Sequence, residues 1–113
     1  MNCGPAPQHY TEAITNYFYP TLKDPDSAEY KFETPYKQAL AAGVFDLQKF
    51  YLGWEVDVQM NAKNSYGGYV GYTSYRFLFQ NEKIAAEADS TANYYWLNMP
   101  GIVATEVTNK AAY

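Results

Sequence analysis

Hydrophobic residues near the start of the chain recur at intervals of three and four. Between residues 8 and 22 they are Tyr10, Ala13, Ile14, Tyr17, Phe18 and Leu22. This spacing places them on one face of an amphipathic α-helix. Pro20 has no backbone N–H, and its ring clashes with the preceding turn of a helix. We therefore expect the helix to end or kink by Tyr19.

After the helix, hydrophobic and polar positions alternate, which is typical of half-buried β-strands. The alternation predicts strands at residues 28–33, 50–60 and 69–80, with a short further strand at residues 84–88. In the strand at 50–60, Trp54, Val56, Val58 and Met60 share one face, and the other face carries Glu55, Asp57 and Gln59. The segment at 69–80 is predicted to pair antiparallel with it, with Tyr75, Phe77 and Phe79 facing inward.

Turns and less regular segments separate these elements. The Asp, Pro and Ser residues of Lys23–Ser27 favour a turn, because Pro presets φ and the short polar side chains bond nearby amides. A tight turn is expected at residues 80–83. Residues 34–46 leave two alternatives open, a helical turn closed by Gly43 or an irregular excursion. Residues 102–107 are either a final strand or a helical piece.

One helix followed by mostly antiparallel strands predicts an α+β fold. The N-terminal helix would pack on one face of a sheet of roughly three to five strands. The chain has 113 residues, of which 48% are hydrophobic, enough for one domain with a core. We expect residues 1–7 to be a flexible lead and residues 8–113 to form the single domain.

Composition and charge argue against several classes of function. The net charge is −4 and Arg76 is the only arginine, so the basic patch that nucleic-acid binding requires is missing. No hydrophobic run approaches the roughly 18 residues of a transmembrane helix. His9 is the only histidine and Cys3 the only cysteine. No metal-ligand set, redox pair or histidine-based triad is therefore expected, and no cofactor is predicted.

Cys3 is followed by Gly4, Pro5, Ala6 and Pro7. A Cys-Gly start that runs into a Pro-rich segment resembles the mature end of a bacterial lipoprotein, in which the cysteine carries the lipid and a tether spaces the domain from the bilayer. The alternative is a lone exposed thiol in a disordered tail. Met1 and Asn2 do not match the upstream half of a lipobox. The lipoprotein interpretation thus requires that the signal peptide was removed or replaced.

Three motifs carry a wider resemblance: LKDPDSAEYKF at residues 22–32, GWEV at 53–56 and NAKNSYGGYVGY at 61–72. Together they resemble a family of small, mostly uncharacterised bacterial lipoproteins and secreted proteins. The resemblance covers residues 14–80. It implies an exported domain, usually lipid-anchored, in the cell envelope on the periplasmic or extracellular side, and it carries no established activity. Relatives have a cysteine near the position of Asp57, so any disulfide of theirs is absent here.

Residues 61–75 are rich in glycine and tyrosine. Glycine-rich turns bind phosphate when they open a helix, whose N-terminal amides then face the anion. Here a predicted strand follows, and the spacing of Gly67, Gly68 and Gly71 is not GxGxxG. The pattern favours a hairpin loop with a glycine bulge over a nucleotide loop. A ligand-facing loop, in which the backbone approaches its ligand closely, remains the other alternative.

Tyrosines recur every three residues through this segment, at Tyr66, Tyr69, Tyr72 and Tyr75. On a strand, Tyr69 and Tyr75 would share one face and Tyr72 the other, so at least one ring should be exposed. Exposed rings beside amides suit sugars or peptide backbones, although tyrosine also simply favours strands. The candidate ligand-binding residues are Asn61, Lys63, Asn64, Tyr66, Gly67, Gly68, Tyr69 and Tyr72.

Glu55 and Asp57 lie two residues apart on one predicted strand, so their side chains project from the same face. Paired carboxylates can hydrolyse glycosides when one of them is partly buried against apolar groups. The simpler interpretation, which we favour, is the solvated face of an edge-facing strand.

Two functional hypotheses follow. The leading one is an exported, lipid-anchored, non-enzymatic envelope protein with a binding or structural role. Its partners would be the membrane, through lipid on Cys3, and an envelope protein or glycan. An open sheet edge could also pair with that of a second copy and form a homodimer. The alternative is a small cell-wall hydrolase or inhibitor-like domain with Glu55 or Asp57 in its site.

Overall fold

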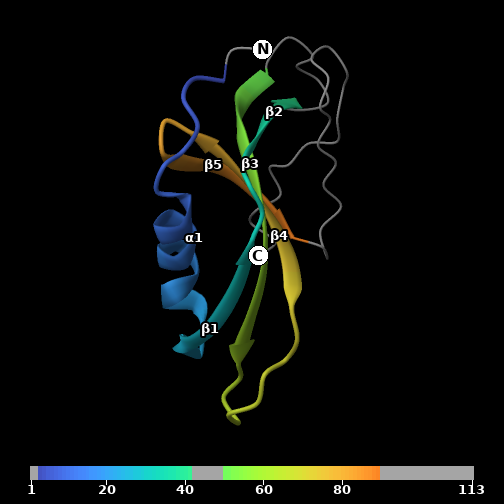
Figure 1. Ribbon diagram of the computed structural model, residues 1–113. Helices are drawn as coiled ribbons and strands as arrows, with labels where there is room; N and C mark the ends of the chain where they lie inside the picture. The colour runs from blue at the N-terminus through green and yellow to red at the C-terminus, as the bar shows by residue number, and fades with distance from the viewer. Residues whose placement is uncertain (1–2, 42–49, 90–113) are drawn as a thin grey trace.

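The computed structural model describes residues 3–41 and 50–89, which form one helix against an antiparallel sheet (Figure 1). The elements are α1 (Tyr10–Phe18), the 3-10 turn η1 (Tyr19–Thr21), β1 (Asp24–Phe32), β2 (Tyr36–Ala41), β3 (Phe50–Lys63), β4 (Thr73–Gln80) and β5 (Lys83–Asp89). All strand pairs are antiparallel. The predicted α+β class, with an N-terminal helix on a sheet of up to five strands, is confirmed.

The helix ends where its sequence predicts. α1 stops at Phe18 and tightens into η1, which contains Pro20. At its other end, no side chain of the helix caps the free N–H groups. Instead the carboxylate of Glu82 accepts hydrogen bonds from the backbone N–H of Gln8 at 2.7 Å and of His9 at 3.0 Å. These two bonds hold the pKa of Glu82 below its ordinary value. A distant turn thus supplies the negative charge that a helix N-terminus favours.

β1 begins earlier than predicted and includes the expected turn. Asp24 pairs with Lys63, and Glu29 pairs with Asn61, with an irregular register between them. The Ser27 hydroxyl donates to the Asp24 carbonyl at 2.6 Å. Ser27 thus bonds locally, although to a carbonyl group and not to an amide as expected, and the segment is an irregular part of a paired strand instead of a free turn.

Residues 36–41 form β2, so both alternatives left open for this segment are wrong there. The reason is the length of β3, which has 14 residues. β1 pairs with its second half, up to Phe32 opposite Val58, and β2 pairs with its first half from Tyr36 opposite Glu55. Between them, the Glu33 N–H donates to the Asp57 carbonyl at 2.9 Å. Gly43 and residues 102–107 lie outside the described residues.

β3 is the central strand of the sheet, whose order is β1-β3-β4-β5 with β2 on the same edge of β3 as β1. β4 and β5 are joined by the predicted tight turn. Asn81 and Glu82 have φ of 51° and 66°, the left-handed conformation that both central residues of a type I′ turn require. The predicted strand at 84–88 is confirmed as part of β5.

The core lies between α1 and one face of the sheet (Figure 1). Its buried members are Ile14, Phe18, Val56, Val58, Met60, Ala62, Phe77 and Phe79. Phe18 contacts Phe77 and Tyr75 edge to face, with ring centroids 5.8 Å and 4.7 Å apart. Burying a side chain such as Ile14 contributes about 1.5 to 3 kcal/mol. The inward orientation predicted for Tyr75, Phe77 and Phe79 is confirmed by this packing.

The residues before α1 lie against the sheet. The Trp54 indole N–H donates to the Gly4 carbonyl at 3.1 Å, Pro7 is buried, and the Cys3 Sγ lies 4.0 Å from the Gln38 carbonyl oxygen. In the part of the chain that the structure describes, no helix is long and hydrophobic enough to cross a membrane.

Candidate functional site

The β3–β4 hairpin projects past the end of α1, at the bottom of Figure 1. β4 begins at Thr73, four residues after the predicted start at residue 69. Tyr69 and Tyr72 therefore lie in the connecting loop, in which Tyr69 forms an isolated β-bridge with Lys63. The prediction that these two tyrosines lie on opposite faces of a strand is therefore wrong, because neither of them is in a strand.

Asn64 organises the turn of this loop. Its Oδ1 accepts hydrogen bonds from the N–H of Tyr66 at 2.9 Å and of Gly68 at 3.2 Å. Its backbone N–H donates to the Gly68 carbonyl at 2.9 Å, and its carbonyl accepts from Gly67 at 3.1 Å. Gly67 has a φ of 82°, which a side chain would disfavour. The predicted glycine-dependent hairpin loop is confirmed.

Asn61 holds the other side of the loop. It is buried, and its Oδ1 accepts a hydrogen bond from the N–H of Gly71 at 3.0 Å. Gly71 has a φ of 103°. The carboxamide oxygens of Asn61 and Asn64 thus both bond the loop backbone. Asn64 Oδ1 accepts two of these hydrogen bonds and Asn61 Oδ1 accepts one, so both residues position the loop, and the exposed tyrosines face outward.

The exposed hydrophobic residues of the loop are Tyr66 (95% exposed), Val70 (68%), Tyr69 (46%) and Tyr72 (41%), which together we term the tip patch. The Tyr69 hydroxyl donates to the Ser27 carbonyl at 2.9 Å, and Lys63 Nζ lies 5.5 Å from the Tyr69 ring centroid. Lys31 Nζ lies 4.1 Å from the Tyr72 ring centroid. Two of the rings are therefore held in place while remaining exposed, and the predicted exposure of at least one ring is confirmed.

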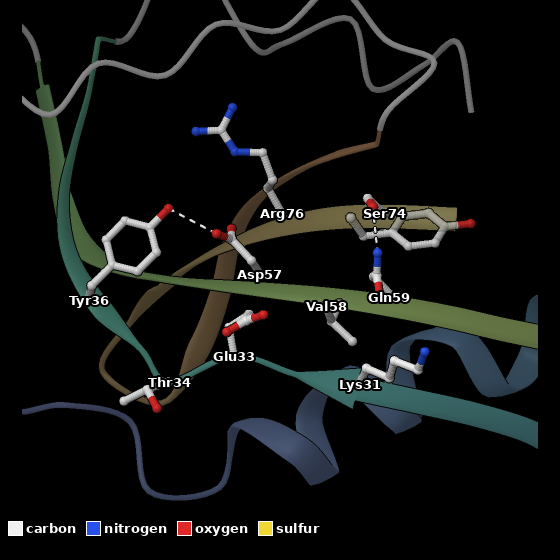
Figure 2. A pocket seen from close by; sticks show the side chains of 10 residues that line it. Lys31, Glu33, Thr34, Tyr36, Asp57, Val58, Gln59, Ser74 and Arg76 are labelled. Atoms are coloured by element: carbon white, nitrogen blue, oxygen red, sulfur yellow. Dashed lines mark hydrogen bonds between the residues drawn. The ribbon is translucent and has the colours of Figure 1, made fainter. Parts of the chain in front are cut away.

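A second candidate site is a pocket of about 540 Å³ on the sheet face opposite the helix (Figure 2). We term it the carboxyl pocket. The described polar residues that line it are Lys31, Glu33, Thr34, Tyr36, Asp57, Gln59, Ser74 and Arg76. They come from β1, β2, β3, β4 and the link between β1 and β2. Its volume lies within the range of small-molecule sites.

A buried polar cluster lies beside this pocket. Glu55 is fully buried and accepts hydrogen bonds from Arg76 Nε at 3.0 Å, Arg76 Nη2 at 3.2 Å and Gln38 Nε2 at 2.9 Å. Gln38 is itself buried, and its Oε1 accepts from the Ala39 N–H. The favoured interpretation of Glu55 and Asp57 as a solvated, edge-facing pair is therefore wrong. β3 has partners on both edges, and this face is not open to solvent at Glu55.

Asp57 connects the buried cluster to the pocket. Its Oδ2 accepts a hydrogen bond from the Tyr36 hydroxyl at 3.1 Å (Figure 2). Its Oδ1 is buried and has no hydrogen-bond partner among the described residues when both carboxyl groups are ionised. A proton on Asp57 would bond Glu55 and satisfy both groups.

The pKa values of the two carboxyl groups move apart. Burial, followed by the hydrogen bond to Glu55 and the charge of Glu55, raises the pKa of Asp57 to about 7. Burial alone would raise the pKa of Glu55, but hydrogen bonds with Asp57, Arg76 and Gln38 outweigh it and lower that pKa. Burial and the two carboxylates also raise the pKa of Tyr36. Asp57 is therefore the proton-carrying member of a coupled pair.

This cluster could have been suspected from one signal in the sequence. Arg76 is the only arginine, and it lies in the strand predicted to pair with 50–60. In the structure Arg76 pairs directly with Asp57 and reaches diagonally to Glu55. That register depends on the loop between the strands, whose length was underestimated. The contribution of Gln38 depends on β2, which the sequence pattern did not predict.

The remaining candidate residues lie apart from both sites. His9 directly precedes α1, and its backbone N–H bonds Glu82. Cys3 is a free, half-buried thiol. Among the residues that the structure describes, no group of three or more His, Cys, Asp and Glu side chains could hold a metal ion.

The described structure is thus a small α+β domain with one face packed on a helix and a buried polar cluster on the other. Comparisons with models of protein families, with curated proteins and with solved structures found no match to the chain. The resemblance to bacterial lipoproteins therefore stays a prediction.

Proposed function

We propose that the protein is an exported, lipid-anchored binding domain of the bacterial cell envelope, attached through Cys3 and without enzymatic activity. The observation that carries the binding role is the tip patch, in which Tyr66 is 95% exposed on a loop held by Asn61 and Asn64. Exposed aromatic groups that rise from an ordered loop are characteristic of interaction surfaces. The partner would be an envelope glycan or protein.

The loop structure supports this role energetically. A binding surface that is ordered before it meets its partner loses less conformational entropy on association. Tyr69 is tied to Ser27 through its hydroxyl, and Tyr72 is packed beneath Lys31. The rings therefore present apolar area and hydroxyl groups in a nearly fixed arrangement, as the aromatic anchors of many interfaces do.

Co-sedimentation with purified peptidoglycan sacculi, together with pull-down from solubilised envelope proteins, tests the binding role. We expect Tyr66→Ala with Tyr69→Ala to reduce retention by about tenfold or more, the effect expected of interfacial aromatic anchors. Tyr19→Ala is the matched control, because Tyr19 is also exposed, at 51%, but lies in η1. Unchanged retention of the double variant, with an intact fold, would reject the tip patch as the binding surface.

The anchor is tested separately. Metabolic labelling of the full-length precursor with palmitate is expected to label the wild-type protein and to be lost in Cys3→Ser. Persistent labelling of the variant, or no labelling of the wild type, would contradict attachment through Cys3. The edges of the described sheet are formed by β1 and β2 on one side and by β5 on the other. Dimerisation by edge pairing would bury one of them, and sedimentation of the purified domain tests this.

A small cell-wall hydrolase, or an inhibitor-like domain, is the second candidate function. It is favoured by the position of Asp57 at the carboxyl pocket and by its pKa of about 7, which suits a general acid. Glu55 is bound to Arg76 and Gln38, so the other carboxylate that lines the pocket is Glu33. Release of reducing ends from sacculi that is abolished by Asp57→Asn would favour the hydrolase. The absence of release would favour the binding domain.

A further inference from the structure

We propose that the carboxyl pocket is a binding site for a neutral sugar, separate from the tip patch. This goes beyond the binding role proposed for the tip patch, because none of the pocket residues belongs to that patch. It takes the pocket of the second candidate function as a binding site and requires no hydrolysis. The inference rests on the shape of the pocket, the balance of its charges and the kinds of hydrogen-bonding groups in its wall.

The described pocket wall has little net charge. Arg76 is a cation, but both of its bonded nitrogens face the Glu55 carboxylate at 3.0 and 3.2 Å. Lys31 and Glu33 carry opposite charges. Asp57 is ionised only in part near neutral pH, since its pKa is about 7. Lys31 Nζ lies over the Tyr72 ring, 4.1 Å from its centroid. A strongly anionic ligand would meet Glu33 and the ionised part of Asp57, and a cation would meet Lys31 and Arg76. The balance therefore favours a neutral ligand.

The hydrogen-bonding groups suit hydroxyl groups in particular. Thr34 and Ser74 carry hydroxyls, Gln59 carries an amide, and Glu33 and Asp57 carry carboxyl groups. Each sugar hydroxyl both donates and accepts a hydrogen bond, so it can pair with every one of these types. Gln59 Nε2 lies 3.5 Å from Ser74 Oγ, the outer limit of a hydrogen bond, so both groups keep bonding capacity for a ligand.

The buried cluster holds the site in shape. Asp57 Oδ1 is buried, so a bound molecule can reach this carboxyl group only through Oδ2, beside the Tyr36 hydroxyl. Tyr36 is 37% exposed and contributes ring surface at the same place. The polar groups that β2, β3 and β4 contribute to the pocket lie on strands that the Glu55–Arg76 pair supports. Precise binding sites require such rigid support. In Figure 2, Asp57 and Gln59 lie along β3, and the Tyr36 hydroxyl points toward the Asp57 carboxyl group.

Heteronuclear NMR titration of the full chain tests the proposal with four probes: chitotriose and maltotriose as neutral sugars, glucuronic acid as an anion and glucosamine as a cation. We expect at least one neutral sugar to shift the backbone amides of Thr34, Gln59 and Ser74. We expect both charged probes to bind at least tenfold more weakly. Three results would overturn the proposal: shifts confined to residues 64–72, preference for a charged probe, or no shifts with either neutral sugar at about 10 mM, ten times a dissociation constant of about 1 mM.

Variants separate the pocket from the tip patch. Gln59→Ala with Ser74→Ala removes two exposed polar groups and should weaken sugar binding at least tenfold without unfolding the domain. Asn16→Ala, on the exposed surface of α1, is the matched control and should bind like wild type. Tyr66→Ala should also leave pocket binding unchanged. Equal affinity of the Gln59/Ser74 variant and the control would overturn the proposal, whatever the fate of the tip patch.

Discussion

Arg76, the only arginine of the chain, donates two hydrogen bonds to the fully buried carboxylate of Glu55. Its Nε lies 3.0 Å from Oε2 and its Nη2 lies 3.2 Å from Oε1. Such a bidentate pair combines charge with fixed geometry. It lies on the face of the sheet that the helix does not cover, beside the carboxyl pocket. Its position makes it the support on which Asp57 and the pocket depend.

Removing Arg76 should destabilise the domain strongly. Arg76→Met leaves the buried Glu55 carboxylate without its charge partner, and loss of one partner from a buried pair costs about 3 kcal/mol or more. Urea denaturation followed by tryptophan fluorescence measures this change. The double variant Glu55→Leu with Arg76→Met removes both charges and should regain most of the lost stability. If Arg76→Met alone is as stable as wild type, the pair does not compensate a buried charge.

Asp57 should make stability depend on pH. Its pKa is raised from 3.8 to about 7 on folding, so the native state binds more protons between these values. The free energy of unfolding should therefore fall as pH rises from about 4 to 7. Glu55, whose pKa is lowered, acts with the opposite sign at lower pH. Tyr36 and Arg76 also face Asp57, and the raised pKa of Tyr36 keeps its hydroxyl protonated throughout this range.

The variant Asp57→Asn tests this assignment, because its amide can donate to Glu55 and accept from Tyr36 as a protonated carboxyl group would. At pH 8 it should be more stable than wild type by on the order of 1 kcal/mol, about one unit of pKa. At pH 4.5 the two proteins should be similar. Urea denaturation at both pH values measures the difference. A loss of stability at pH 8 as large as at pH 4.5 would contradict a protonated Asp57.

Gly53 should be irreplaceable where Gly68 is not. A Cβ at Gly53 would overlap the carbonyl oxygen of Phe79, which is backbone and cannot rotate away. Gly53→Ala should lower the free energy of unfolding by about 2 kcal/mol, within the range for overpacking. A Cβ at Gly68 meets nothing within 4 Å and φ there is not positive, so Gly68→Ala is the control and should be nearly neutral. Thermal melts of both variants make the comparison.

Asn64 should control the order of the tip patch. Asn64→Ala deletes the acceptor for the N–H groups of Tyr66 and Gly68, which should cost about 1 kcal/mol. Amide hydrogen exchange at Tyr66 and Gly68 should accelerate by several fold. Asn64→Asp keeps an acceptor at the same position and should exchange almost like wild type. Equal acceleration in both variants would indicate that the side-chain oxygen does not hold the turn.

The helix and the strands with strong hydrophobic periodicity were predictable, because in each of them the periodic residues pack against the same core. The helix at residues 10–18 and the inward faces of β3 and β4 are examples. β2 was not predictable in the same way. Residues 36–41 form a strand because their backbone pairs with the free edge of the first half of β3. That edge exists only after the sheet has assembled.

The two candidate sites show the same difference between local sequence patterns and tertiary contacts. The glycines indicated a hairpin loop, since positive φ is a property of short segments, and the spacing of the tyrosines indicated at least one exposed ring. That Asn61 and Asn64 bond the loop backbone is shown only by the structure. The expectation that Glu55 and Asp57 are solvated was wrong. Alternation shows which side chains share a face of a strand, but it does not show what packs against that face. The burial of Glu55 comes from tertiary contacts, and its pairing with Arg76 comes from strand register.

By itself, the sequence determined the α+β class, the C-terminal end of the helix and the turn that ends β4, because these depend on periodicity and on residues with restricted backbone conformations. Only the tertiary structure decided that Gln38, Glu55, Asp57 and Arg76 meet on one face of the sheet. Their pKa values and their pocket arise from desolvation and from distances between strands. Neither quantity is encoded in the residue types themselves, since both depend on which groups the fold brings together and removes from water.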